Sequence, residues 1–228
     1  STDDWLQPGH PPAGRPPESL VLQALFEQRI YRTLMRDPGL TNEVLALLPP
    51  DARTRARLTV TAMATLIAGV QPVASTAGFR TGPPEPPGAL LADFHEAEQR
   101  FGVPWEVLAA VMYVESKFGR ARSASTAGAQ GPMQFLPSTW NQYGMGGNID
   151  DPHDAILGAA NFLRANGAPA DGRRALYAYN HSDRYVDAVL DLADRLREEP
   201  RSYYPLYAWQ VFVVTTHGDV QLTGPGSG

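Results

Sequence analysis

A single glutamate, Glu115, lies at the end of an apolar stripe on a predicted helix. Pro104 suits the first turn of that helix, and Gly119 suits the position just past its end. Three apolar residues share a face with Glu115, at offsets of seven, four and three residues: Leu108, Val111 and Met112. An apolar wall disfavours the charged form of a carboxyl group and raises its pKa. A carboxyl group that keeps its proton near neutral pH can donate it to a leaving oxygen.

The same helix has a plainer interpretation, in which Glu115 stands at the edge of the core and pairs with Arg120 or Arg122. Glutamates are rarely fully buried, so this is the commoner outcome for one helix taken alone. The segment that follows favours a catalytic role for Glu115 instead. Residues 123–140 combine small residues and glycines with Met133-Gln134-Phe135, and then begin a helix at a proline. Small side chains let the backbone approach a ligand, and a flexible thioether can line a sugar-binding groove. Met133 and Phe135 fit core positions equally well.

Three motifs in this order resemble those of the soluble and membrane-bound lytic transglycosylases, which have a lysozyme-like helical fold. They are Glu115–Gly119 (ESKFG), Gly128–Pro137 (GAQGPMQFLP) and Ala178–Ser182 (AYNHS). The segment Asp150–Gly167 is also similar to the corresponding helix of that superfamily. The resemblance covers roughly residues 90–200 and is nearest to secreted or membrane-anchored actinobacterial members.

The resemblance implies a role for each matching residue. Glu115 matches the catalytic acid and base. Ser125, three residues before Gly128, matches the serine that contacts the substrate, and Ser123 is close enough to be a rival. The other expected substrate-binding residues lie near the scissile bond or opposite the glutamate: Gly131, Met133, Gln134, Tyr179 and Asn180.

A second catalytic carboxylate is not evident in the sequence. Ordinary glycosidases use two, ~5–5.5 Å apart when retaining and ~6.5–9.5 Å apart when inverting. No Asp or Glu occurs between Glu115 and Asp150. Asp151 instead fits a helix N-cap and Asp154 a first-turn acid that the helix dipole favours. His181 and Ser182 lack an acid that would orient a nucleophile, and Ser182 fits an N-cap.

The resemblance implies cleavage of the β-1,4 bond between N-acetylmuramic acid and N-acetylglucosamine in peptidoglycan glycan strands. Glu115 would protonate the glycosidic oxygen, then take the proton from the C6 hydroxyl as that oxygen attacks the anomeric carbon. A tethered nucleophile makes this attack far more probable than a bimolecular one, and a 1,6-anhydro sugar results. Two alternatives stay open: a one-glutamate muramidase that uses water, and a non-catalytic glycan-binding module of the cell wall.

Composition excludes other classes of function. The net charge of −5 and the absence of a basic stripe argue against nucleic acid as a partner. Without cysteine there is no disulfide, thiolate zinc site or cysteine nucleophile. Gly144–Asn148 lacks the alternating acids of a calcium loop, so we expect no metal and no cofactor. The apolar stretch Leu58–Val70 is shorter than the ~20 residues that span a bilayer. We expect an extracytoplasmic location, with any export signal or membrane anchor absent from this chain.

The chain as a whole is predicted to be mainly α, with five parts. These are a flexible Pro-rich segment (1–17), an N-terminal helical unit (18–70), a linker with five prolines (71–88), the lysozyme-like domain (89–200), and a C-terminal β-hairpin and tail (201–228). In the helical unit, Thr41 and Asp51 are the expected N-caps of the second and third helices. The first helix shows an apolar pattern that predicts its buried face: Leu22, Leu25, Phe26, Ile30 and Leu34. This unit either packs on the catalytic domain or binds a partner protein.

Overall fold

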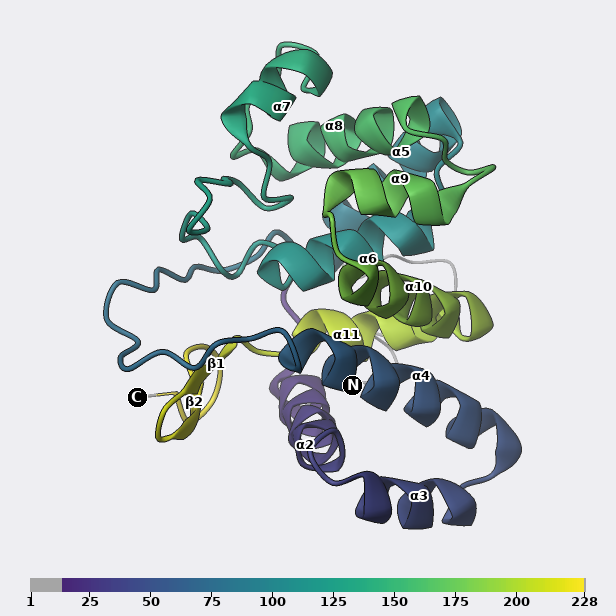
Figure 1. Ribbon diagram of the computed structural model, residues 1–228, viewed down its shortest axis with the longest axis vertical. Helices are drawn as coiled ribbons and strands as arrows, with labels where there is room; N and C mark the ends of the chain where they lie inside the picture. Colours follow the sequence, from purple (N-terminus) through teal and green to yellow (C-terminus); the bar gives the residue numbers. More distant parts are fainter. Residues whose placement is uncertain (1–13, 228) are drawn as a thin grey trace.

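The structure is a computed structural model that describes residues 14–227, so most of the predicted flexible segment at 1–17 lies outside the described residues. The fold is mostly helical with a two-stranded antiparallel hairpin, as predicted (Figure 1). The helices are α2 (Glu18–Leu34), α3 (Pro38–Leu47), α4 (Pro50–Ile67), α5 (Pro87–Phe101), α6 (Trp105–Ser116), α7 (Pro137–Tyr143), α8 (Pro152–Ala165), α9 (Gly172–Tyr179), α10 (Asp183–Glu198), the short 3-10 turn η1 (Pro200–Ser202) and α11 (Tyr203–Ala208). The hairpin strands are β1 (Phe212–Thr215) and β2 (Gly218–Gln221).

Helix α6 lies at the centre of the fold and contacts α5, α8 and α10. A helix that is apolar on nearly all sides is stable only when it is buried. Seven of its residues are buried: Leu108, Ala109, Ala110, Val111, Met112, Tyr113 and Ser116. The helix begins after Pro104 and ends at Ser116, and Lys117 is its C-cap in the left-handed region. Glu115 therefore occupies the last turn of the most enclosed helix.

The N-terminal helices pack directly on the rest of the protein. Helix α4 lies along α10, and α2 lies along α11, so the two ends of the described chain meet (Figure 1). The buried side chain of Gln28 on α2 makes two hydrogen bonds with the backbone of Gln210, as donor at 2.9 Å and as acceptor at 2.8 Å. Residues of α2 and α4 belong to the same hydrophobic core as α6 and α10. This unit was expected either to pack on the catalytic domain or to bind a partner protein, and these contacts support packing.

Two details of the N-terminal helices differ from the sequence-based expectation. Asp37, not Thr41, caps α3 by accepting a hydrogen bond from the backbone N–H of Leu40, and the Thr41 hydroxyl donates to the Leu34 carbonyl. Asp51 lies in the first turn of α4, whose N-cap is Pro49. In both cases a proline fixes the first helical turn upstream of the expected cap.

The buried face of α2 is also rotated from the predicted one. Leu25 and Leu34 are buried, but three residues of the predicted stripe are exposed, most of all Phe26 at 68%: Leu22, Phe26 and Ile30. The buried face instead includes Leu20, Ala24 and Gln28. Gln28 can belong to this buried face because its hydrogen bonds with Gln210 are satisfied, and a polar side chain paired in this way can replace an apolar one.

Arg195 on α10 joins the N-terminal helices to the centre of the fold. Its guanidinium is 4% exposed, donates to the Thr59 hydroxyl on α4 at 2.9 Å, and pairs with Glu27 on α2 at 3.1 Å. It also lies 5.5 Å from the centre of the Trp209 ring. We expect Arg195→Ala to lower the free energy of unfolding by about 3 kcal/mol. The substitution removes a buried cation and leaves the Glu27 carboxylate and the Thr59 hydroxyl without their hydrogen-bond donor.

Urea-induced unfolding measures that loss, and Arg197→Ala is the matched control. Arg197 lies on the same helix and pairs with Asp194, but both side chains are about half exposed. Its removal should change stability by less than about 0.5 kcal/mol. Equal effects of the two substitutions would contradict the structural role assigned to Arg195.

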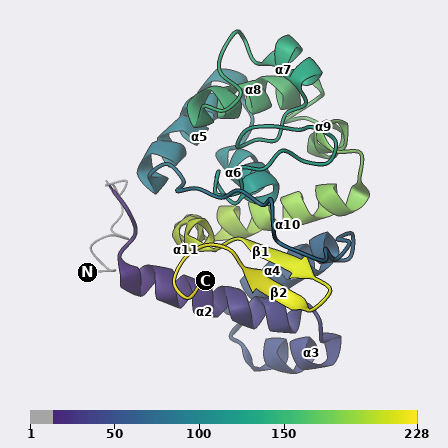
Figure 2. The same cartoon turned by 90° about the vertical axis from the view of Figure 1, so that its left-hand side faces the viewer.

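The segment between α4 and α5 is held to its neighbours along its length. Val73 bonds on both sides to the hairpin, donating to the Val214 carbonyl and accepting from Thr216. Gly82 donates to the Arg120 carbonyl, and the side chain of Arg122 donates to the Pro83 carbonyl at 2.7 Å. Figure 2 shows the hairpin lying across α2 and α4, with this segment beside it. Within the described residues, no helix is long and apolar enough to cross a membrane.

Candidate active site

The loop that follows α6 is fixed to the end of that helix. Lys117, Phe118 and Gly119 all have positive φ angles, of 54°, 58° and 83°. The Ser116 hydroxyl donates to the Pro132 carbonyl and accepts from the N–H of Gly119 at 2.8 Å. This single hydroxyl therefore joins the end of α6 to the glycine-rich segment predicted to form a binding wall.

The glycine-rich segment closes on itself as a tight turn. Gln130 and Phe135 exchange backbone hydrogen bonds of 2.8 and 2.9 Å, and Gln134 has a φ of 50°. Gly131 has a φ of 73°, and a Cβ there would collide with the Ile149 carbonyl oxygen. Only glycine satisfies both conditions at this position. The amide of Gln134 donates back to the Gly131 carbonyl at 2.9 Å, and its side chain stays partly exposed.

Met133 has no exposed surface and belongs to the hydrophobic core. Its thioether is therefore not on a solvent-facing wall, which favours the core position that the sequence left open over the groove position. Its carbonyl oxygen accepts a hydrogen bond of 2.7 Å from the Tyr179 hydroxyl. Through this bond the end of α9 holds the turn against α6.

Glu115 is partly exposed and lies among groups that shift its ionisation. Burial raises the pKa of Glu115 from 4.5 to about 7, opposed by smaller effects of the Tyr185 hydroxyl and the Lys117 ammonium. The Tyr185 hydroxyl is buried and makes no hydrogen bond of ordinary geometry within residues 14–227, although it lies near enough to Glu115 to act on its pKa. The carboxyl group therefore keeps its proton to a higher pH than an ordinary glutamate does, which suits a proton donor.

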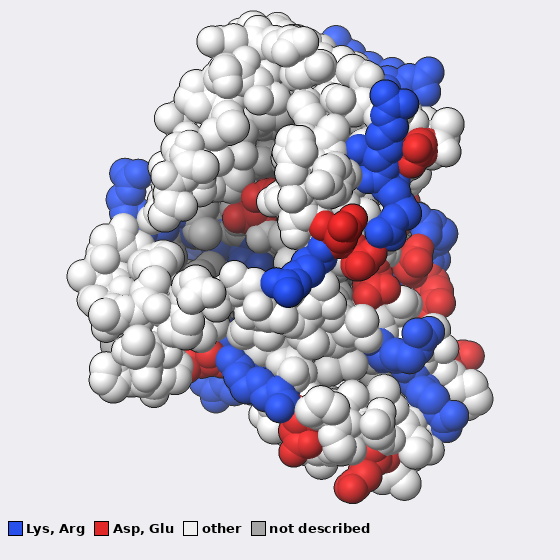
Figure 3. Space-filling model, in the orientation of Figure 1, with Lys and Arg blue, Asp and Glu red and all other residues white. Residues whose placement is uncertain are grey.

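The groups that shift the pKa of Glu115 include no second carboxylate among the described residues. Figure 3 shows a hollow in the face of the molecule, with acidic and basic atoms in its depth. A site with one partly exposed carboxyl group beside the Tyr185 hydroxyl can donate and accept one proton. It lacks the paired carboxylates of an ordinary glycosidase.

The two candidate serines have different surroundings. The Ser123 hydroxyl accepts from the Arg80 N–H at 2.7 Å and donates to the Gly78 carbonyl, so it holds the segment before α5. Ser125 is exposed, and its hydroxyl accepts from the Ala129 N–H at 3.0 Å. Of the two, Ser125 keeps its hydroxyl proton available for a ligand. Asn180 is exposed at the end of α9 and follows Tyr179 directly.

The predicted caps near the site are present. Asp151 accepts from the Asp154 N–H and caps α8, and Ser182 accepts from the Tyr185 N–H and caps α10. Asp151, His153 and Asp154 bring potential metal-binding atoms within 4.8 Å of one another. Each already has a partner, since Asp154 accepts from the Asn148 N–H and His153 pairs with Glu96. These partners give the cluster a structural role at the start of α8.

Tyr185 and Lys117 were not among the predicted site residues. Tyr185 follows the cap of α10, and its apolar neighbours at helical spacing made it indistinguishable from a core residue in the sequence. Lys117 is the only lysine of the chain, and its place in the Glu-Ser-Lys-Phe-Gly motif was the available signal. Burial lowers the pKa of Lys117 to about 8, with the nearby Arg32 guanidinium as a second cause.

Comparisons with known proteins identify the family of the central part of the chain. Residues 93–199 match the model of the transglycosylase SLT domain. The chain is 28% identical over 122 residues to the membrane-bound lytic murein transglycosylase F of Thiobacillus denitrificans, an alignment that covers 50% of this chain and 26% of that relative. The chain thus spans about a quarter of the length of the curated relative that it matches. No solved structure matches the chain. Residues 93–199 therefore belong to the transglycosylase SLT domain family, whose fold is lysozyme-like.

Proposed function

We propose that this protein is a peptidoglycan lytic transglycosylase that cleaves the bond between N-acetylmuramic acid and N-acetylglucosamine, with Glu115 as its only catalytic acid and base. The observation behind this proposal is the raised pKa of Glu115, about 7, in a site where no second carboxylate acts on it. The similarity to a lytic murein transglycosylase supports the substrate class. Peptidoglycan lies in the cell envelope, so we place the activity there.

In the first step, the protonated carboxyl group of Glu115 gives its proton to the glycosidic oxygen as the bond from that oxygen to the anomeric carbon breaks. The N-acetyl group of the muramic acid stabilises the positive charge that develops on the anomeric carbon. Glu115 is then a carboxylate. The Tyr185 hydroxyl, which favours the charged form of Glu115, stabilises the protein in this state.

In the second step, the Glu115 carboxylate takes the proton from the C6 hydroxyl while the C6 oxygen bonds to the anomeric carbon. The product is a 1,6-anhydro sugar, and Glu115 regains its starting form. Since the nucleophile belongs to the substrate, the site needs no carboxylate to activate water. Ser125, Gln134 and Asn180 have exposed or partly exposed side chains and are the proposed glycan contacts. The family resemblance implies that Tyr179 lies opposite Glu115.

Mass spectrometry of a sacculus digest tests this function. We expect soluble muropeptides with anhydro ends, whose mass does not change on treatment with borohydride. Reducing ends, which borohydride does convert, would show that water is the nucleophile and that the protein is a muramidase. Release of no soluble muropeptide at all, together with retention on sacculi, would identify a glycan-binding module.

A further inference from the structure

A cavity of about 330 Å³ lies between the N-terminal helices, the hairpin and the end of α6. Its walls are largely apolar and come from α4, the segment after it and β1: Met63, Leu66, Val70, Phe79, Phe212 and Val214. Two cationic side chains, Lys117 and Arg32, also line it. An apolar pocket with cations in its lining suits a ligand that has both methyl groups and a negative charge.

The Lys117 ammonium has unused capacity for such a ligand. It donates one hydrogen bond, of 2.9 Å, to the Tyr113 carbonyl, and lies 4.1 Å from the centre of the Tyr113 ring. An ammonium has three N–H donors. No carboxylate of residues 14–227 forms an ion pair with it, although Glu115 attracts it at longer range. When Glu115 holds its proton, that attraction is lost and Lys117 has no compensating charge.

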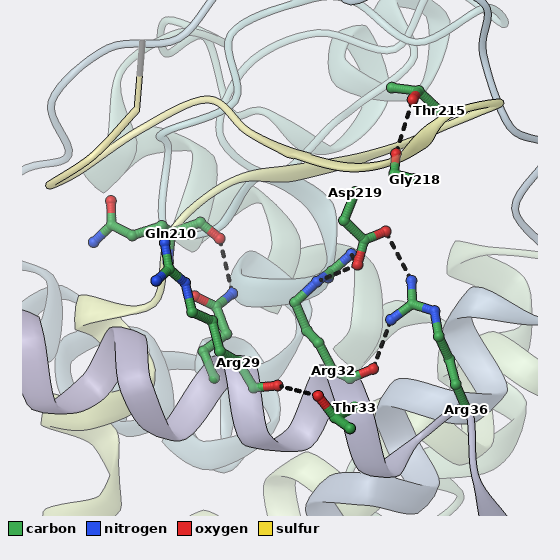
Figure 4. Close-up of polar contacts among 9 residues, drawn as sticks. Arg29, Arg32, Thr33, Arg36, Gln210, Thr215, Gly218 and Asp219 are labelled. Atoms are coloured by element: carbon green, nitrogen blue, oxygen red, sulfur yellow. Dashed lines mark hydrogen bonds and ion pairs between the residues drawn. The ribbon is translucent and has the colours of Figure 1, made fainter.

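The nearest acidic side chain from the hairpin is already neutralised. Asp219 accepts from Arg32 at 2.9 Å and from Arg36 at 2.7 Å, so two guanidinium groups share one carboxylate (Figure 4). Arg32 therefore already has a carboxylate partner. Of the two cations that line the pocket, Lys117 is the one that forms no ion pair among residues 14–227.

The pocket adjoins the candidate active site. Lys117 lines the pocket, and its ammonium also lowers the pKa of Glu115, so this side chain is close to both. Leu66 and Val70 line the pocket on either side of Gly69, and a Cβ at Gly69 would lie 3.8 Å from a guanidinium nitrogen of Arg184. Arg184 directly precedes Tyr185. The start of α10, which carries Tyr185, therefore lies close to the residues after α4 that line the pocket.

We propose that this pocket holds the peptide stem of the bound glycan strand, with the Lys117 ammonium pairing with a stem carboxylate. The proposal rests on the function proposed above, because the stem belongs to the glycan strand that Glu115 is proposed to cleave. Peptidoglycan stems combine alanine methyl groups with free carboxylates, which match the apolar walls and the cationic lining. The pocket thus makes the enzyme selective for strands with charged stems.

Binding of a disaccharide tetrapeptide tests the proposal, because this ligand lacks the bond that the enzyme is proposed to cleave. Calorimetry compares the natural ligand with one whose stem carboxylates have been converted to amides. We expect the wild-type protein to bind the charged form about tenfold more tightly, as for a hydrogen-bonded ion pair that is partly removed from water. Lys117→Met, which keeps the length of the side chain, should bind both forms equally weakly.

Two variants control for charge. Lys117→Arg keeps the positive group and should retain the preference. Arg173→Met removes one positive charge from an exposed ion pair with Asp187 and should also retain it. Equal binding of both ligands by the wild-type protein, a preserved preference in Lys117→Met, or no binding of either ligand would overturn the proposal. Failure of the proposed function looks different, because sacculi would then yield no muropeptides while the charge preference persists.

Discussion

Glu115→Gln is expected to lower the rate of glycan cleavage by at least about 10³-fold while the protein stays folded. Glutamine has the shape of the natural side chain but cannot donate a proton to the glycosidic oxygen or accept one from the C6 hydroxyl. Both proposed steps are lost together, because one group performs them. Release of soluble muropeptides from sacculi measures the rate.

Glu106→Gln is the matched control, since Glu106 lies in the first turn of the same helix and outside the site. It should cleave at nearly the wild-type rate, whereas comparable activity in Glu115→Gln would refute the one-carboxylate mechanism. Thermal unfolding separates activity from stability. The folded protein holds the Glu115 proton up to a pKa of about 7, above its ordinary 4.5. The wild type therefore loses stability as the pH rises through this window, and Glu115→Gln should gain relative to it.

The pH dependence of cleavage should show one ionisation on the alkaline side, centred near pH 7. The free enzyme must hold the Glu115 proton to begin the reaction, and burial gives that group a pKa of about 7. Above this value kcat/KM should fall tenfold for each pH unit. An alkaline decline centred near 4.5, the ordinary pKa of a glutamate, would show that Glu115 is not the proton donor.

Tyr185→Phe should move this decline to higher pH, because the hydroxyl of Tyr185 lowers the pKa of Glu115. Tyr177→Phe is the control, since Tyr177 is 43% exposed on α9 and is not among the groups that act on Glu115. A merely structural Tyr185 would change the rate or the melting temperature without displacing the midpoint. The shift in the midpoint is therefore the decisive observation.

Much of the fold was predictable from local sequence patterns. The helix around Glu115, the caps at Asp151 and Ser182, and the hairpin all follow from punctuation and periodicity within short windows. The rotated face of α2 did not, because its orientation depends on Gln28 meeting Gln210, which is 182 residues away. Local apolar spacing has no information about such a partner.

The candidate site was predictable only in part, for the same reason. The resemblance of three motifs to those of lytic transglycosylases made Glu115, Tyr179 and Asn180 candidates. The burial of Met133 and the approach of Tyr185 to Glu115 depend on how α9 and α10 pack against α6. The pocket beside Lys117 needs elements from both ends of the described chain, so no single window of the sequence predicts it.

The pairing of Gln28 with Gln210 has a consequence for the order of folding. A ribosome makes α2 long before β1, so the partner-facing side of α2 stays unprotected during most of synthesis. Contacts between distant segments form slowly. The chain loses entropy when a long loop closes, and the favourable contacts that offset this loss form only afterwards. We expect the pocket beside Lys117, which combines Arg32 with Val214, to be among the last regions protected from hydrogen exchange during refolding. We therefore expect the core around α6 to fold first and the proposed stem-binding pocket to form after it.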